Sequence, residues 1–128
     1  MQEELGIDVC FSDLLYVGRR IFVYCFAPGI KEYEFQDVYL LCRDIRPEQL
    51  MLQPEELDGI IELDVENGIE LLSGKRLRVQ VPFMKTGSET APVLITIDDF
   101  VPCLDNYYLK LLLLVRRYVN GDREHLLI

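Results

Sequence analysis

The sequence lacks most of the groups on which common catalytic motifs depend. Its 128 residues include no tryptophan and one histidine, and none of the four cysteines forms a Cys-x-x-Cys pair. The histidine, His125, lies in a charged tail with no nucleophile placed to use it, which disfavours Ser–His–Asp and Cys–His mechanisms. No zinc spacing, P-loop or dinucleotide-binding glycine motif is present. Any chemistry must therefore rest on carboxylates.

Basic residues are also scarce, with 13 Lys and Arg against 22 Asp and Glu and a formal net charge of −9. Nucleic-acid binding and attachment to anionic membrane surfaces both draw their affinity from Lys and Arg, so neither partner is expected. An acidic protein still binds a phosphorylated small molecule when a divalent cation lies between the two negative partners.

Long apolar runs and a basic leader are missing as well. The most apolar stretch, residues 109–115, is interrupted by Lys110 and is far shorter than the ~20 residues that span a bilayer. The first residues are acidic where a secretion signal is basic. The four cysteines have apolar neighbours, which indicates buried free thiols in a reducing compartment. We expect a cytoplasmic protein.

The apolar pattern predicts a mixed α/β class, with strands dominating the first two thirds of the chain. Length and the absence of linkers predict one domain over residues 1–128. A turn at residues 18–20 is expected to join the first two strands into a hairpin. The predicted strands are residues 9–17, 21–27, 34–42, 60–63, 76–81 and 93–97.

Three helical segments are predicted. Residues 2–5 suit the last turn of a helix, and Gly6 suits its left-handed C-cap. Asp64 is the expected N-cap of a short second helix. Apolar residues at helical spacing near the C-terminus predict a long third helix, capped by Asp98 or Asp99. We expect the last three residues to pack against another element.

Two pairs of adjacent glutamates are the candidate chemical groups. Glu3 and Glu4 lie in the first predicted helical turn, and Glu55 and Glu56 precede the predicted strand at residues 60–63. Carboxylate oxygens are ligands that Mg²⁺ and Mn²⁺ prefer, with a further ligand needed from another element. Taken alone, each pair also fits an ordinary solvated surface, which is the commoner case.

Residues 2–7, Gln-Glu-Glu-Leu-Gly-Ile, resemble the end of the Nudix box. In that family the box runs as Gly, a Glu, then Arg-Glu-apolar-x-Glu-Glu-x-Gly-apolar, so Met1 falls on the apolar position after Arg-Glu. Residues 53–63 resemble the later segment of the family in which Glu-apolar leads into a strand. Residues 98–102, before the apolar helix, resemble the ending of Nudix proteins near the isopentenyl-diphosphate isomerase branch.

The resemblance implies a Nudix-like α/β/α sandwich with a mixed sheet, incomplete at its N-terminus, where early strands and the start of the catalytic helix are absent. It implies that Glu3 and Glu4 bind Mg²⁺ or Mn²⁺ and that Glu56 is a catalytic ligand or base, with Glu55 as the less favoured register. The implied function is metal-dependent hydrolysis of a diphosphate-linked metabolite, with attack of activated water at phosphorus. Loss of the Arg-Glu pair is expected to impair it.

Alternatives remain open. The chain could be a non-catalytic binding or interaction protein on a Nudix-derived fold, self-associating as a homodimer through an exposed sheet. It could also be an unrelated acidic α/β domain, in which Glu3, Glu4 and Glu56 lie far apart. Arg76 and Arg78 are candidates for contacting a substrate phosphate, although a solvated strand face is the commoner explanation for such residues.

Overall fold

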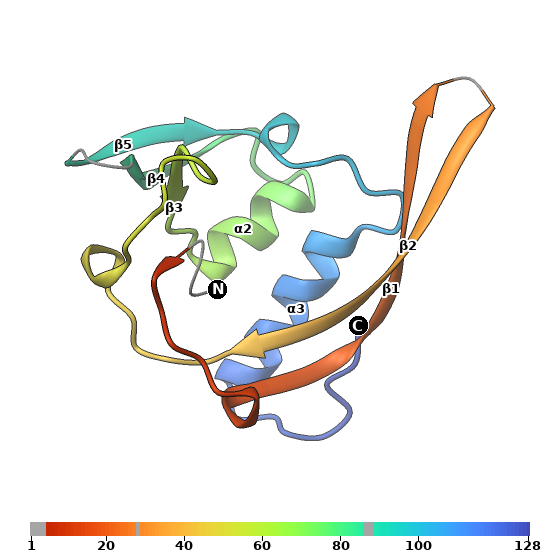
Figure 1. The fold of residues 1–128 in the computed structure, drawn as a ribbon, viewed down its shortest axis with the longest axis horizontal. Coiled ribbons are helices and arrows are strands. Elements are labelled where there is room, and N and C mark those ends of the chain that lie inside the picture. The colour runs from red at the N-terminus through yellow and green to blue at the C-terminus, as the bar shows by residue number, and fades with distance from the viewer. Residues whose placement is uncertain (1–4, 28, 86–88) are drawn as a thin grey trace.

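The computed structural model describes residues 5–27, 29–85 and 89–128, and within them two antiparallel sheets and the helices α2 and α3 (Figure 1). The elements, with 3-10 helices written η, are η1 (Phe11–Asp13), β1 (Leu14–Ala27), β2 (Ile30–Leu41), η2 (Pro47–Gln49), β3 (Gly59–Ile61), α2 (Val65–Leu72), β4 (Val79–Lys85), β5 (Thr90–Ile95), η3 (Ile97–Asp99) and α3 (Tyr107–Val119). β1 pairs with β2, and the second sheet has the order β3–β4–β5. The predicted mixed α/β class is confirmed.

The strand directions differ from the expectation. Every pairing recorded within the described ranges is antiparallel, so these residues form two antiparallel sheets where one mixed sheet was predicted. None of the helices in the same ranges is both long enough and apolar enough to cross a membrane.

The first hairpin turns later than predicted. Gly18 was expected to begin the turn, but β1 continues through it and the chain reverses between Ala27 and Ile30. The pairing register shifts between Tyr16 and Gly18, and Gly18 has φ +132°. Glycine serves a β-bulge as readily as a turn, because it tolerates positive φ in both. The result is one long hairpin that projects from the body of the molecule (Figure 1).

The inner face of this hairpin packs against α3 and the C-terminal tail. The buried residues of this first cluster are Val17, Val38, Leu114 and Leu126. The backbone N–H of Ile128 donates to the carbonyl oxygen of Val17 at 2.8 Å. The predicted packing of the last three residues is therefore confirmed. This contact places the C-terminal end of the chain against β1.

The long helix starts later than predicted. It begins at Tyr107, and Asp99 instead accepts a hydrogen bond from the backbone N–H of Thr96 at 2.7 Å. This reciprocal capping closes the short helix η3, so neither Asp98 nor Asp99 caps α3. Asn106, with φ +54°, precedes the long helix in its place.

The second cluster lies between α2 and the three-stranded sheet. Asp64 caps α2 as predicted and accepts from the N–H of Asn67 at 3.0 Å. β4 begins at Val79, three residues later than the predicted strand at residues 76–81. The buried residues of this cluster are Leu71, Val79, Val81 and Ile95.

The two helices bring the halves of the molecule together. A Cβ atom added to Gly68 of α2 would lie 2.5 Å from Cδ1 of Leu112 of α3. Only glycine allows this close approach without a shift of the neighbouring side chain. The two clusters are thereby joined through the interface between α2 and α3.

Candidate functional site

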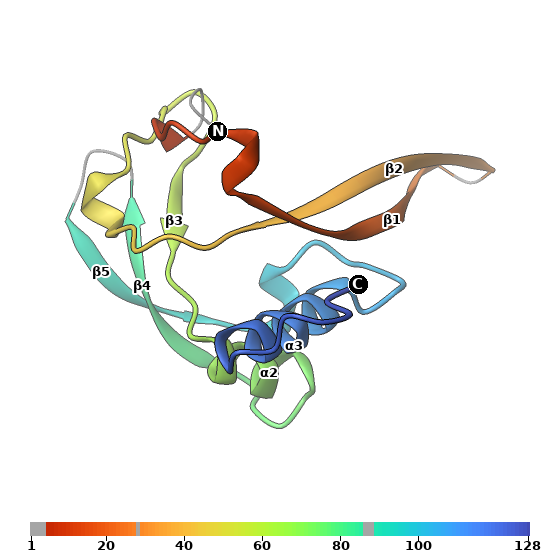
Figure 2. The same cartoon turned by 90° about the horizontal axis from the view of Figure 1, so that it is seen from below.

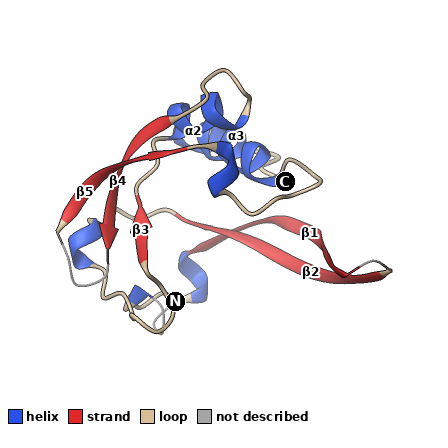
Figure 3. Ribbon diagram, turned by 90° about the horizontal axis from the view of Figure 1, so that it is seen from above, coloured by secondary structure: helices blue, strands red, loops and turns tan. Residues whose placement is uncertain are grey.

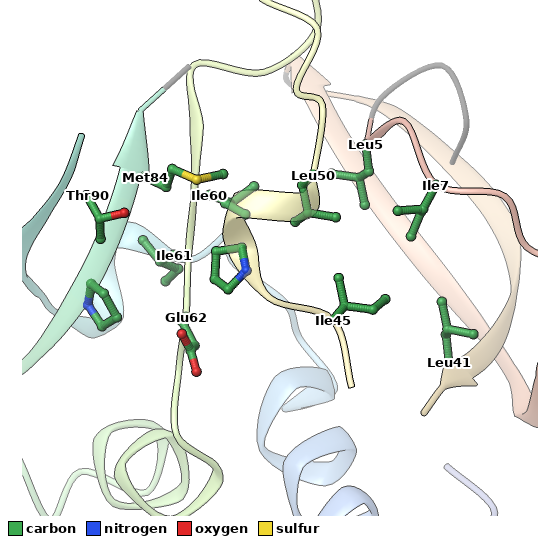
Figure 4. Close-up of a pocket in the computed structure, with 12 residues that line it drawn as sticks. Leu5, Ile7, Leu41, Ile45, Leu50, Ile60, Ile61, Glu62, Met84 and Thr90 are labelled. Atoms are coloured by element: carbon green, nitrogen blue, oxygen red, sulfur yellow. The ribbon is translucent and has the colours of Figure 1, made fainter. Parts of the chain in front are cut away.

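An apolar cleft of about 470 Å³ lies between the three-stranded sheet and the segments that lead into and out of the hairpin. Figure 4 shows Ile60 and Met84 on its sheet side, Leu50 near its middle, and Ile7 and Leu41 on its hairpin side. The described residues that line it are Leu5, Ile7, Leu41, Ile45, Pro47, Leu50, Ile60, Ile61, Glu62, Pro82, Met84 and Thr90. The volume falls within the ~300–1,000 Å³ typical of small-molecule sites.

The polar side chains of the lining are few. Glu62 follows β3 and supplies a carboxylate, and Thr90 at the start of β5 supplies a hydroxyl. The other lining side chains are aliphatic, apart from the thioether of Met84. Such a lining takes up an apolar group and uses one or two polar contacts to orient it.

The N-terminal segment is fixed to the loop that forms one wall of this cleft. The backbone N–H of Met51 donates to the carbonyl oxygen of Leu5 at 3.1 Å. Gly6 follows with φ +65°, and a Cβ atom there would lie 2.7 Å from Cβ of Met51. The predicted left-handed glycine is therefore confirmed, and the close approach is a second reason why this position holds glycine.

The three predicted site residues have different outcomes. Glu3 and Glu4, the predicted metal ligands, lie outside the described residues. Glu56 is exposed in the turn before β3, where its backbone N–H donates to the carbonyl oxygen of Gln53 at 3.0 Å. Met51 and Glu56 therefore lie in the same loop. Through Met51 this loop contacts Leu5, the residue that follows Glu4 in the sequence. Within residues 5–27, 29–85 and 89–128, no group of three or more His, Cys, Asp or Glu side chains is placed to hold a metal ion.

Arg76 and Arg78, the two candidate arginines, do not lie on a strand as predicted. Arg76 lies before β4 and forms an ion pair with Glu70 of α2 at 2.5 Å. It also donates to the side-chain oxygen of Asn67 at 3.3 Å. Arg78 is exposed and also precedes β4, so the two do not share a strand face. His125 is exposed in the C-terminal tail, as expected.

Arg20 is a buried cation that the pattern of the sequence did not single out. Its guanidinium lies 3.8 Å from the ring centroid of Tyr107 and 4.9 Å from that of Phe22. It donates to Sγ of Cys103 at 3.6 Å and lies 3.8 Å from a carboxylate oxygen of Asp105. Arg20 is not among the residues lining the cleft, and these contacts give it a structural role between β1 and α3.

The prediction of buried thiols is wrong for two cysteines. Cys10 and Cys42 are exposed, while Cys103 is half-buried. The side chain of Cys25 lies outside the described part of the chain. Apolar neighbours in the sequence did not indicate burial of these two side chains. Cys10 precedes the 3-10 helix η1, and Cys42 follows the end of β2.

Shifted pKa values occur in ion pairs, on the hairpin and in the aromatic contacts of α3. A hydrogen bond from Arg19 lowers the pKa of Asp37, and one from Arg117 lowers that of Asp122. Burial raises the pKa of the Tyr108 hydroxyl. None of these groups lines the cleft.

These features describe an apolar cleft whose wall carries the loop of Glu56 and the residue that follows Glu4. No family model, no curated protein and no solved structure matches the chain.

Proposed function

We propose that the chain is a Nudix-type hydrolase that acts on a diphosphate-linked metabolite with Mg²⁺ or Mn²⁺. The observation that carries the proposal is the hydrogen bond between Met51 and Leu5. It ties the loop that bears Glu56 to the residue that directly follows Glu3 and Glu4. Glu56 lies in one of these two segments, and Glu3 and Glu4 precede Leu5 of the other in the sequence. Contact between the two segments is what a cation site with oxygen ligands from both would require.

A Nudix-like α/β/α sandwich is part of the same proposal. Two observations support it. Leu5 is helical and is followed by the left-handed Gly6 and then by strands. In Figures 2 and 3 the N-terminal segment lies beside the base of the hairpin, on the side away from α3. A helical residue before the hairpin and the helix α3 on the other side of it agree with the order of layers in such a sandwich.

In this proposal Glu3 and Glu4 hold the metal ion and Glu56 accepts a proton from the attacking water. A bound divalent cation neutralises the diphosphate and lowers the pKa of its bound water. The aliphatic cleft takes the organic group attached to the diphosphate, because Leu5, the residue after Glu4 in the sequence, lines it. The donor set consists of carboxylates, which suits Mg²⁺ or Mn²⁺ better than a softer metal.

The test is Mg²⁺- and Mn²⁺-dependent release of phosphate or of a monophosphate product from a panel of nucleoside diphosphate derivatives. Glu56→Gln is expected to lower turnover about 100-fold, the usual scale for loss of a general base. Glu3→Gln and Glu4→Gln are expected to raise the metal concentration needed for half-maximal turnover. Glu124→Gln, at an exposed tail position, is the matched control. Turnover and metal dependence that are unchanged in Glu3→Gln and Glu4→Gln would exclude the proposed ligands.

A non-catalytic binding protein is the second candidate, favoured by the aliphatic lining of the cleft. It predicts no metal-dependent turnover, together with saturable binding of the apolar dye 8-anilinonaphthalene-1-sulfonate. Ile61→Gln, in the cleft, is expected to weaken dye binding. Ile97→Gln, at a similarly exposed position away from the cleft, is expected to leave it unchanged.

A further inference from the structure

The pairing register divides the hairpin into two faces. Residues that lie directly opposite each other in an antiparallel pair share a face. Arg19 pairs with Asp37, and Ile21 pairs with Phe35. The buried Val38 belongs to the alternate face, which packs against α3. The face that carries Ile21 and Phe35, here called the outer face, therefore points away from α3.

This outer face is apolar and exposed. Ile21, Tyr33 and Phe35 have 51%, 65% and 68% of their surface open to solvent. Nearer the base of the hairpin, the ring of Tyr39 lies 5.2 Å from that of Tyr16 and 5.6 Å from that of Phe11, which is exposed as well. Aromatic residues are the type most enriched where proteins bind one another.

No described element covers this face along the projecting part of the hairpin. Figures 2 and 3 show α3 on one side of β1 and β2 and open space on the other. A two-stranded sheet is only marginally stable by itself in water, and exposed strands of this length are usually covered. The hairpin therefore has the features of a surface that a partner completes.

The total exposed area of the chain is larger than that of a typical monomer of its size. The chain exposes 9508 Å², whereas a folded monomer of 14.9 kDa exposes about 7,000 Å². The excess is roughly 2,500 Å², while a standard interface buries about 800 Å² on each partner. The chain thus exposes enough additional surface for a stable dimer interface.

The charge on the outer face favours a second copy of the same chain. The protein carries a net charge of −9, so two copies repel each other over most of their surface. On the outer face, however, Arg19 forms an ion pair with Asp37 at 2.8 Å and the neighbouring exposed side chains Ile21 and Phe35 are uncharged. This is a part of the surface where two copies meet without bringing like charges together.

We propose that the outer faces of two hairpins pack against each other about a two-fold axis and make the protein a homodimer. In such an interface the same patch occurs on both copies, so Ile21, Phe35 and Tyr33 of each chain contact the equivalent patch of the other. The proposal does not depend on hydrolysis, and its test does not use activity.

The test is sedimentation velocity over a range of micromolar concentrations. The wild-type chain is expected to sediment as a dimer. Ile21→Lys and Phe35→Lys are each expected to raise the dissociation constant at least about 30-fold, the effect of losing an interface hot spot. Leu94→Lys is the matched control, because Leu94 is an equally exposed apolar residue on a strand of the other sheet. It is expected to remain dimeric.

Circular dichroism of each variant shows whether the fold is retained. Arg19→Glu is a second probe, since it removes no apolar side chain and sets like charges beside Asp37 on both copies. It is expected to dissociate the dimer, and added salt is expected to restore part of the association. A wild-type chain that is monomeric at all concentrations would overturn the proposal. A dimer that survives Phe35→Lys and Arg19→Glu in folded protein would overturn the assigned face.

Discussion

The two sheets of the molecule differ in the residues that they present to solvent and to other chains. In the three-stranded sheet, Pro82 of β4 lies directly opposite Pro92 of β5. β5 is an edge strand, and because proline lacks a backbone N–H, Pro92 weakens this edge as a template for further strand pairing. Neither strand of the hairpin, β1 or β2, contains proline, and the hairpin exposes aromatic side chains on one face. Association is therefore expected at the hairpin and not at the three-stranded sheet.

The two apolar clusters also differ in how far apart their members lie in the sequence. The cluster under the three-stranded sheet uses residues from Leu71 to Ile95, all within one part of the chain. The cluster under the hairpin joins Val17, near the start, to Leu126, near the end. The hairpin half therefore depends on contacts of high sequence separation, which form late and at a greater entropic cost.

The largest expected effect comes from the same substitution in each cluster. Leu71→Ala and Leu114→Ala both remove a side chain that is almost fully buried. Each is expected to lower the free energy of unfolding by about 3 kcal/mol, through lost burial and the cavity left behind. Because α2 contacts α3 at Gly68, both variants are expected to shift one common transition in denaturant-induced unfolding.

Two separate transitions, each moved by only one of the variants, would show that the halves unfold independently. In that case the contact between Gly68 and Leu112 would not couple them. Leu77→Ala, at a side chain that is exposed and outside both clusters, is the control. It is expected to change stability by less than about 0.5 kcal/mol.

A smaller and more local effect is expected at the anchor of the N-terminal segment. Gly6→Ala places a Cβ atom at positive φ, which costs about 1–2 kcal/mol, and adds a contact of 2.7 Å with Cβ of Met51. The hydrogen bond from Met51 to Leu5 is expected to break. Amide hydrogen exchange of Met51 measures this directly, and metal-dependent turnover is expected to fall with it.

Gly74→Ala is the matched control for that variant. Gly74 also has positive φ, at +77°, but an added Cβ atom there has no neighbour within 4 Å. It shares the conformational cost without the collision at Met51. Equal protection of the Met51 amide in the two variants would show that this anchor does not depend on Gly6.

Local signals in the sequence predicted the parts of the fold that depend on a few adjacent residues. Asp64 caps α2 because its side chain reaches an N–H three residues ahead, and Gly6 adopts the left-handed conformation that few other residues accept. Gly18 shows where such signals fail, because glycine allows both a turn and a bulge. The start of α3 was misplaced because Asp99 is used by Thr96 in a nearer cap.

The cleft could not be predicted, because its lining comes from segments far apart in the chain. Leu5, Leu50 and Met84 each look like ordinary core residues in the sequence. Glu62 gives no signal of its own beyond following a short apolar strand. The glutamate pairs were identified through local motifs, but only the tertiary contact between Met51 and Leu5 relates their two segments.

The smallest expected effect concerns the charge balance of the outer face. A hydrogen bond from Arg19 lowers the pKa of Asp37 below its ordinary value of 3.8. A lowered pKa in the folded state means that this pair stabilises the fold above that value, and the contribution is lost as pH falls through the lower, folded-state pKa. Arg19→Met is expected to raise the pKa of Asp37 toward 3.8 in an NMR titration, while Asp122, which is paired with Arg117, titrates unchanged. If Asp37 titrates identically in both proteins, Arg19 does not set its charge. If its pKa rises as expected, the hydrogen bond from Arg19 keeps Asp37 ionised to a lower pH than an ordinary aspartate. Acid below that pH then dissociates the dimer by leaving Arg19 unpaired on both copies.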